Sequence, residues 1–132
     1  MILVDTCVWI DYFRDKRTPA TDLLREFEGQ ADADICISSI IYFEILRGIS
    51  NPRRRRFVAE ALNRLERRDC PFSSVETMIR YDLLCRRHGV NLPKLGDWLI
   101  IQTALDHHLE LLSSDRDFAR ILPYVPLQLV RI

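Results

Sequence analysis

Short, largely apolar runs alternate along this sequence with longer stretches whose apolar residues recur every three to four positions. The short runs cover residues 2–4, 34–37, 109–113 and 127–130, and a weaker candidate covers 69–72. Runs of this kind predict strands buried on both faces, and the longer stretches predict helices that pack against them. We therefore expect one domain over residues 1–132, an α/β three-layer sandwich with a mainly parallel central sheet.

The composition excludes several classes of protein. Hydrophobic residues make up 48% and charged residues 29% of the 132 residues, and no run of about 18 apolar residues occurs, so we expect no membrane span. The apolar start lacks a basic flank and ends at Asp5, which favours a strand over a signal peptide and predicts a cytoplasmic protein. With four glycines and no Gly-rich loop after a strand, a Rossmann or P-loop enzyme is excluded.

The four cysteines are spread along the chain without a Cys-x-x-Cys pair or a histidine at zinc-ligand spacing. In a reducing compartment such residues behave as small hydrophobic side chains. We therefore expect free thiols and no zinc site at Cys7, Cys36, Cys70 and Cys85.

The stretch from Gly96 to Leu105 has helical periodicity, and Asp97 stands on or beside its apolar stripe. A buried, unpaired carboxylate costs several kcal/mol and tends to take up a proton. Asp97 therefore requires a cation or the positive end of a helix dipole. The simpler alternative is a helix cap, because Asp is common at helix starts.

Two further acids follow predicted strands, Asp5 after residues 2–4 and Asp115 after residues 109–113. In open α/β sheets the ligand crevice lies at the carboxyl ends of the strands. Glu44 lies in so apolar a helical stretch that we expect it to be largely buried. Each acid has a local alternative: Glu44 could pair with Arg47, and Asp115 could cap the helix predicted at 116–122. Together, the four acids are expected to converge on one crevice.

Four carboxylates in one pocket repel one another unless a cation neutralises them. Oxygen ligands select a hard ion such as Mg²⁺ or Mn²⁺, which commonly acts on phosphate groups. The acids therefore predict metal-assisted phosphoryl chemistry.

The chain resembles PIN-domain ribonucleases, and among them the small VapC-type toxins of toxin–antitoxin pairs. The resemblance rests on four segments: Val4-Asp5-Thr6-Cys7, residues 44–48, residues 96–105 and residues 111–118. It implies a metal-dependent endoribonuclease whose catalytic and metal-binding residues are Asp5, Glu44, Asp97 and Asp115. It further implies supporting hydroxyls on Thr6 and Ser113. Asp117 is a possible substitute for Asp115, or an acid favoured by the helix dipole.

The same resemblance implies a homodimer and a VapB-type antitoxin that covers the acidic groove. Aromatic residues near the first helices could receive the antitoxin, although core packing is the preferred interpretation for Trp9 and Phe13; the four candidates are Trp9, Tyr12, Phe13 and Tyr42. An arginine-rich stretch could hold RNA phosphates through guanidinium forks, or could simply be a solvated helix face. Its residues are Arg47, Arg53, Arg54, Arg55 and Arg56.

Two other functions compete with this one. A catalytically inactive PIN-like module would bind RNA or protein without cutting, but it would have no need for costly buried acids. A receiver-type phospho-acceptor domain also gathers acids at strand ends. That type requires an Asp at the end of a middle strand, where this sequence has Ile37-Ser38-Ser39.

Overall fold

A computed structural model describes residues 1–30, 34–91 and 94–132. Within these ranges five short strands form one sheet in the order β3-β2-β1-β4-β5, and every neighbouring pair is parallel. The strands are β1 (Ile2–Val4), β2 (Ile35–Ile37), β3 (Glu66–Arg67), β4 (Glu110–Leu112) and β5 (Gln128–Leu129). The expected parallel α/β architecture is confirmed.

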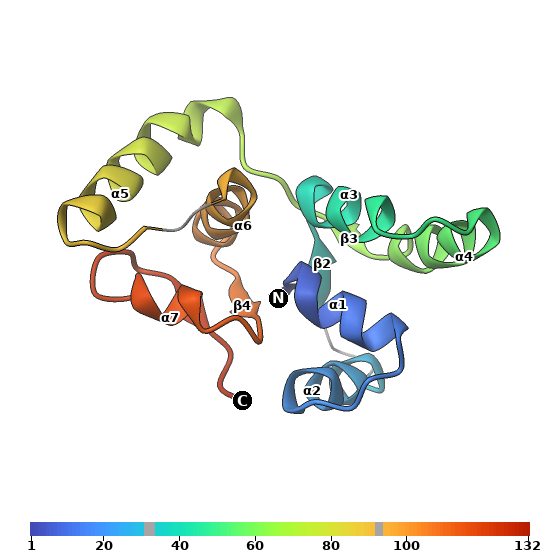
Figure 1. Ribbon diagram of the computed structural model, residues 1–132. Helices are drawn as coiled ribbons and strands as arrows, with labels where there is room; N and C mark the ends of the chain where they lie inside the picture. Colours follow the sequence, from blue (N-terminus) through green and yellow to red (C-terminus); the bar gives the residue numbers. More distant parts are fainter. Residues whose placement is uncertain (31–33, 92–93) are drawn as a thin grey trace.

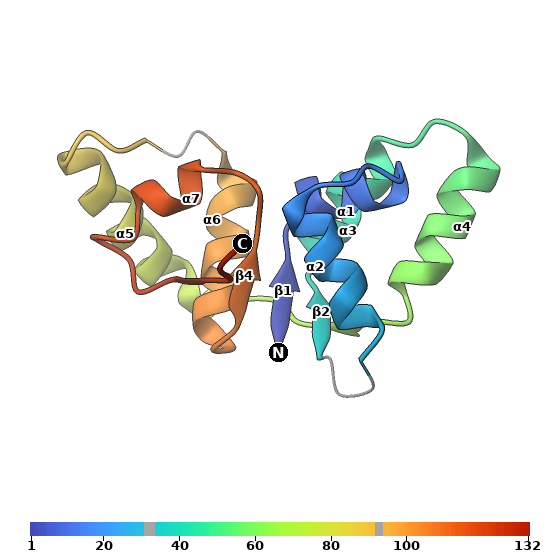
Figure 2. The same cartoon turned by 90° about the horizontal axis from the view of Figure 1, so that it is seen from below.

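Helices connect the strands, as parallel pairing requires. They are α1 (Thr6–Phe13), α2 (Pro19–Glu28), α3 (Ser39–Arg47), α4 (Pro52–Leu62), α5 (Val75–Arg87), α6 (Leu95–Asp106) and α7 (Asp117–Arg120), with a 3₁₀ turn η1 at Phe72–Ser74. Figures 1 and 2 show α1–α4 gathered on one side of β1 and α5–α7 on the other. In the described part of the chain, no helix has the length and apolar character that crossing a membrane would require.

Several helices begin where local sequence signals place them. Thr18 and Thr21 form a capping box at the start of α2, with Pro19 at the first helical position. Ser38 and Asn51 accept hydrogen bonds from the backbone at the starts of α3 and α4. These capping contacts set the first residue of α2, α3 and α4.

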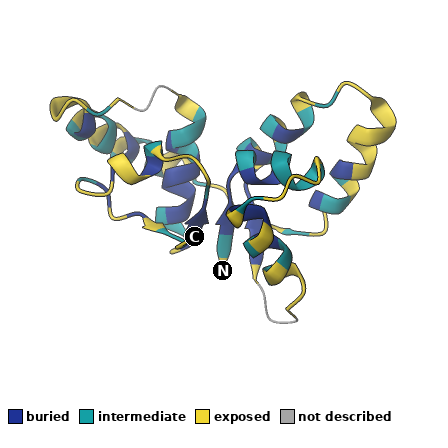
Figure 3. Cartoon of the chain, turned by 60° about the horizontal axis from the view of Figure 1, so that its bottom comes forward, coloured by how far each residue is buried: buried dark blue, intermediate teal, exposed yellow. Residues whose placement is uncertain are grey.

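The core lies around the central strands. Leu3, Val4, Leu111 and Leu112 are fully buried, and Figure 3 shows burial in the strands and on the inner faces of the helices. By contrast α4 buries only Val58 and Leu62. Its arginine-rich side is exposed to solvent.

One predicted strand is wrong. Residues 69–72 form no strand, and β3 instead covers Glu66–Arg67, which pair with Cys36 and Ile37. Both residues of β3 are exposed, so this edge strand forms through its backbone and carries no apolar signal. The last strand is shorter than the expected 127–130, because only Gln128–Leu129 pair with β4.

Candidate active site

The register of β1 against β4 brings together the residues that follow these strands. Val4 pairs with Leu112, so Asp5 and Ser113 emerge side by side at the carboxyl edge of the sheet. Asp5 N donates to Leu112 O at 2.9 Å, and Ser113 Oγ donates to Asp5 Oδ2 at 2.7 Å. Backbone pairing therefore fixes the position of the Asp5 side chain.

Three donors hold the Asp5 carboxylate. Besides Ser113, Thr6 N donates to Oδ1 at 2.8 Å and Cys7 Sγ donates to Oδ2 at 3.2 Å. Asp5 is 5% exposed, and this burial raises its pKa, while the three hydrogen bonds act in the opposite direction and the charge of Glu44 raises it further. The result is a buried and rigidly oriented carboxylate.

Glu44 reaches the same region from α3. Its Oε1 accepts a hydrogen bond from Thr6 Oγ1 at 2.8 Å, so the start of α1 orients a side chain on another helix. Glu44 is shielded from most of the solvent, in line with the expected burial, whereas its neighbour Phe43 is exposed. In the described chain Glu44 forms no ion pair with Arg47, whose guanidinium lies over the Phe43 ring.

Asp97 lies in the first turn of α6 but does not cap it. The N-cap position is Lys94, and no side-chain hydrogen bond closes this end of the helix. Burial, together with the charges of Asp5, Asp115 and Glu44, raises the pKa of Asp97 from 3.8 to about 6, and the charge of Lys94 acts in the opposite direction. The structure thus brings all four predicted acids into one electrostatic cluster.

Asp115 precedes α7 but is not its N-cap, a position that Arg116 occupies without a side-chain hydrogen bond. Asp115 Oδ1 accepts from Asp117 N at 2.9 Å, which supports the first turn of α7, and its charge also raises the pKa of Asp97. Its own backbone N donates to Ser113 Oγ at 3.0 Å. Asp117 instead lies 3.6 Å from Arg120 in an ion pair. The catalytic and metal-binding roles of these acids stay predictions.

The arginines of α4 do not contact the carboxylates within the described residues. Arg54 donates to Phe13 O and lies over Phe57, and Arg55 Nη1 donates to Ile49 O at 2.9 Å. These two arginines therefore contribute to the packing of α4 against the chain. Arg53 and Arg56 are exposed.

Cys7 was not among the predicted site residues. Its Sγ lies 3.3 Å from Ser114 Oγ as well as against Asp5, and burial raises the pKa of the thiol. Its position two residues after Asp5, in the first turn of α1, is the sequence signal that could have indicated it.

The donor set fits a hard divalent cation. All four acids offer oxygen, and none of them forms an ion pair in the described part of the chain. Burial and the charges of Asp5, Asp115 and Glu44 raise the pKa of Asp97, and Lys94 offsets this only in part. No three His, Cys, Asp or Glu side chains of the described residues stand close enough to enclose an ion. Mg²⁺ tolerates this, because it retains several waters and needs only one or two carboxylates.

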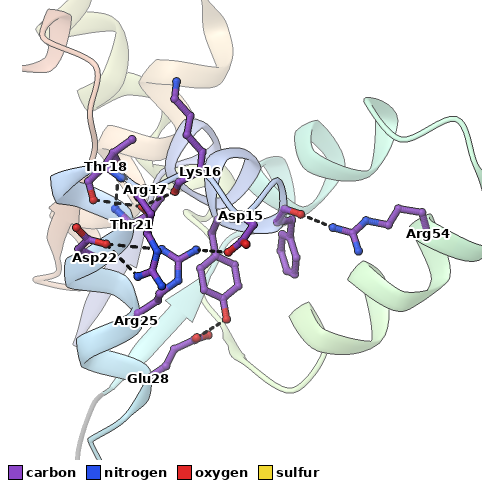
Figure 4. A network of polar contacts seen from close by, with 11 residues as sticks. Asp15, Lys16, Arg17, Thr18, Thr21, Asp22, Arg25, Glu28 and Arg54 are labelled. Carbon is purple, nitrogen blue, oxygen red and sulfur yellow. Dashed lines mark hydrogen bonds and ion pairs between the residues drawn. The ribbon is translucent and has the colours of Figure 1, made fainter.

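A separate groove of about 330 Å³ lies between α1, α2 and α4. Trp9, which is 2% exposed, lines it, and its Nε1 has no hydrogen-bond partner among the described residues. Tyr12 donates to Glu28 Oε2 at 2.6 Å, and Figure 4 shows Arg25 bridging to Asp15 beside it. Phe13 also lines the groove, whereas Tyr42 lies on α3 under the Arg67 guanidinium.

Comparison with known proteins agrees with this fold. Residues 2–122 match the family described as the PIN domain. VapC ribonuclease Mb1587 of Mycobacterium bovis and Ribonuclease VapC11 of Mycobacterium tuberculosis are each 28% identical to the chain, over 97% of its length and 96% of theirs.

Solved structures share the fold at lower identity. The structure of VapBC2 from Rickettsia felis, bound to a promoter DNA fragment, matches with a TM-score of 0.77 at 20% identity, covering 98% of both chains. VapBC-1 from nontypeable Haemophilus influenzae matches with a TM-score of 0.75 at 20% identity, covering 98% of this chain and 97% of that one. With the family match extending over nearly the whole sequence, the chain belongs to the PIN-domain family.

Proposed function

We propose that this protein is a metal-dependent endoribonuclease and the toxin of a toxin–antitoxin pair in the cytoplasm. The carboxylate cluster is the observation that carries this proposal: Thr6 bonds to both Asp5 and Glu44, and Gly96, beside Asp97, lies against Glu44. Burial and the charges of Asp5, Asp115 and Glu44 raise the pKa of Asp97 accordingly. The names of the two mycobacterial relatives, both VapC ribonucleases, support RNA as the substrate.

Asp5 and Asp97 are the proposed principal ligands of the metal, and Glu44 and Asp115 act through water. Mg²⁺ or Mn²⁺ bound there would supply the positive charge that stabilises a phosphodiester during attack by water. Ser113, Cys7 and the Thr6 amide hold Asp5 in one orientation, so little reorganisation is needed when substrate binds. The Thr6 hydroxyl does the same for Glu44.

We propose that exposed arginines of α4 hold the RNA backbone. Arg53 and Arg56 are exposed, and a guanidinium pairs with phosphate oxygens in a bidentate geometry. Arg54 and Arg55 have partners within the fold, so their contribution to RNA binding is smaller.

The groove lined by Trp9 is the proposed site for a segment of a VapB-type antitoxin. Its aromatic walls provide apolar area, and the buried Trp9 Nε1 lacks an acceptor that a peptide carbonyl could supply. The titles of the Rickettsia and Haemophilus structures name VapBC pairs, which supports a protein partner of this kind.

We propose that a second copy of the chain binds to the surface formed by α3 and α6. Phe43 on α3 and Leu95 on α6 are both more than half exposed, and Ile40 and Leu99 line a depression beside them. Apolar surface of this kind is typical of protein contacts. Analytical ultracentrifugation of Phe43→Lys and Leu95→Lys would detect loss of the homodimer.

The metal requirement tests the enzymatic proposal. Purified protein, freed from any partner by unfolding and refolding, is incubated with a mixed RNA pool in Mg²⁺, Mn²⁺ or EDTA. We expect cleavage with either metal and none in EDTA. Tight RNA binding without cleavage in any metal would instead favour the inactive binding module.

A further inference from the structure

A hollow of about 520 Å³ lies between the beginning of α2 and the segment that follows β4. It is lined by residues 18–20, 113–116, 129, 130 and 132. The pairing of β5 with β4 builds one wall, because Val130 N donates to Leu111 O at 2.9 Å beside the end of β4.

The hollow and the carboxylate cluster share a wall. Ser113, Ser114 and Asp115 line the hollow, while Ser113 Oγ also bonds to Asp5 and the charge of Asp115 acts on Asp97. A group bound in the hollow therefore lies directly beside the groups proposed to act on a phosphodiester.

Two of the hydroxyls at this hollow have committed partners. Thr18 Oγ1 accepts from Thr21 N at 3.0 Å in the capping box of α2. Ser113 Oγ is bonded to Asp5 and accepts from Asp115 N. Neither hydroxyl is therefore available to a ligand without breaking a contact that supports the fold or the cluster.

Two other polar groups remain available. Ser114 is exposed, and its Oγ contacts only the Cys7 thiol among the described residues, at 3.3 Å. Arg116 is exposed and forms no ion pair in the described part of the chain. The hollow thus presents one exposed hydroxyl, in contact only with the Cys7 thiol, and one exposed guanidinium without an ion pair among the described residues.

Apart from the Asp115 carboxylate, the remaining lining is apolar, from Pro19, Ala20, Leu129, Val130 and Ile132. A nucleotide combines these chemistries, since its base has flat apolar faces, its ribose has hydroxyls and its phosphate is an anion. A volume of about 520 Å³ falls in the range of small-molecule sites.

We propose that this hollow binds the nucleotide next to the scissile phosphate of a single-stranded RNA. Arg116 pairs with the neighbouring phosphate, Ser114 bonds to the ribose or the base edge, and Leu129 and Val130 contact the base face. This inference rests on the proposed ribonuclease function. It means that residues at the start of α2 and around β5 determine part of the preference for the base beside the cut.

A binding experiment tests the site without any need for cleavage. The four nucleoside 5′-monophosphates are titrated into ¹⁵N-labelled protein in EDTA, and backbone amide shifts are followed by NMR. We expect the largest shifts at residues 113–116 and 129–130. Arg116→Gln removes a charge-assisted bond and should weaken binding about tenfold. Arg120→Gln, an exposed arginine of α7 outside the lining, is the matched control and should bind as the wild type does.

Filling the hollow gives a second variant. Val130→Trp should abolish these shifts while the far-ultraviolet spectrum and the Tm stay close to those of the wild type. If Val130→Trp is unfolded, Arg116→Gln alone decides. Shifts centred elsewhere, or equal affinities for Arg116→Gln and Arg120→Gln, would overturn the proposal.

Cleavage of a random RNA pool separates this inference from the proposed function. Sequencing of the cut ends should reveal a changed base preference beside the cut for Arg116→Gln and an unchanged one for Arg120→Gln. Cleavage by the wild type with the same preference in both variants would refute the subsite and leave the ribonuclease standing. Mononucleotide binding in the hollow by a protein that cuts nothing would do the reverse.

Discussion

Gly96 lies so close to Glu44 that a Cβ on Gly96 would stand 3.3 Å from Glu44 Oε2. The same carboxylate is tied to Thr6 through its other oxygen. Glu44 is therefore enclosed between the starts of α1 and α6, and the absence of a side chain at Gly96 allows the first turn of α6 to bring Asp97 alongside.

Gly96→Ala should lower the cleavage rate about tenfold, because the added methyl group displaces a carboxylate whose position is fixed by Thr6. The fold should persist, since Ala favours helix over Gly. Gly29→Ala is the control, because its Cβ would meet its neighbours at an ordinary 3.6 Å. Equal rates for wild type and Gly96→Ala would show that the close approach has no role in the reaction.

Substitution of the two acids that follow β4, Asp115 and Asp117, should affect the cleavage rate very differently. Asp115 acts on Asp97 electrostatically, whereas Asp117 is paired with Arg120. Asp115→Asn should therefore reduce kcat by about a hundredfold, and Asp117→Asn should stay within about threefold of the wild type. Initial rates on one labelled RNA measure both. A larger loss in Asp117→Asn would reverse the assignment.

Asp97 should destabilise the metal-free protein at neutral pH. Its pKa in the folded protein, about 6, lies above the ordinary 3.8, so the folded state retains a proton that the unfolded state loses as pH rises through this window. Stability therefore falls between these pH values. In EDTA, Asp97→Asn should have a higher Tm than the wild type at pH 7.5 and a similar Tm at pH 4.

Metal should remove this difference. On the proposed function, Mn²⁺ should bind the folded wild type and raise its Tm at pH 7.5, and it should raise the Tm of Asp97→Asn much less. If both proteins had the same Tm at every pH in EDTA, the raised pKa of Asp97 would be contradicted.

Trp9→Phe should weaken antitoxin binding about tenfold, because the indole N–H loses its peptide acceptor while the aromatic wall remains. Trp98→Phe is the matched control, since Trp98 Nε1 is also buried without a partner among the described residues but lies outside this groove. Calorimetry with the cognate antitoxin measures both. Similar losses in the two variants would argue against the groove.

The sequence predicted the parts of the site that depend on local pattern. Asp5 and Asp115 were placed because a strand precedes each, and parallel strands end at one edge. For Asp97 and Glu44, the prediction rests on a conflict between a charged side chain and its apolar neighbours in the sequence. The pair β1–β4 then brings Asp5 to Ser113, a contact between residues 108 positions apart.

Other features depend on tertiary packing and left little trace in the sequence. The edge strand β3 consists of two exposed charged residues, so no apolar pattern could indicate it. The exposed Phe43 shows that α3 faces solvent on one side, although its sequence is almost wholly apolar. The close approach of Gly96 to Glu44 and the hollow beside Ser114 arise only when helices from distant segments meet.

The rate of RNA cleavage by Asp97→Asn, relative to the wild type under saturating Mn²⁺, tests the central claim most directly. The carboxylate cluster predicts a loss of at least about a hundredfold, in a protein whose circular dichroism and RNA affinity are unchanged. Cleavage by Asp97→Asn at the wild-type rate would show that the acids at the carboxyl edge of this sheet are not the reactive centre.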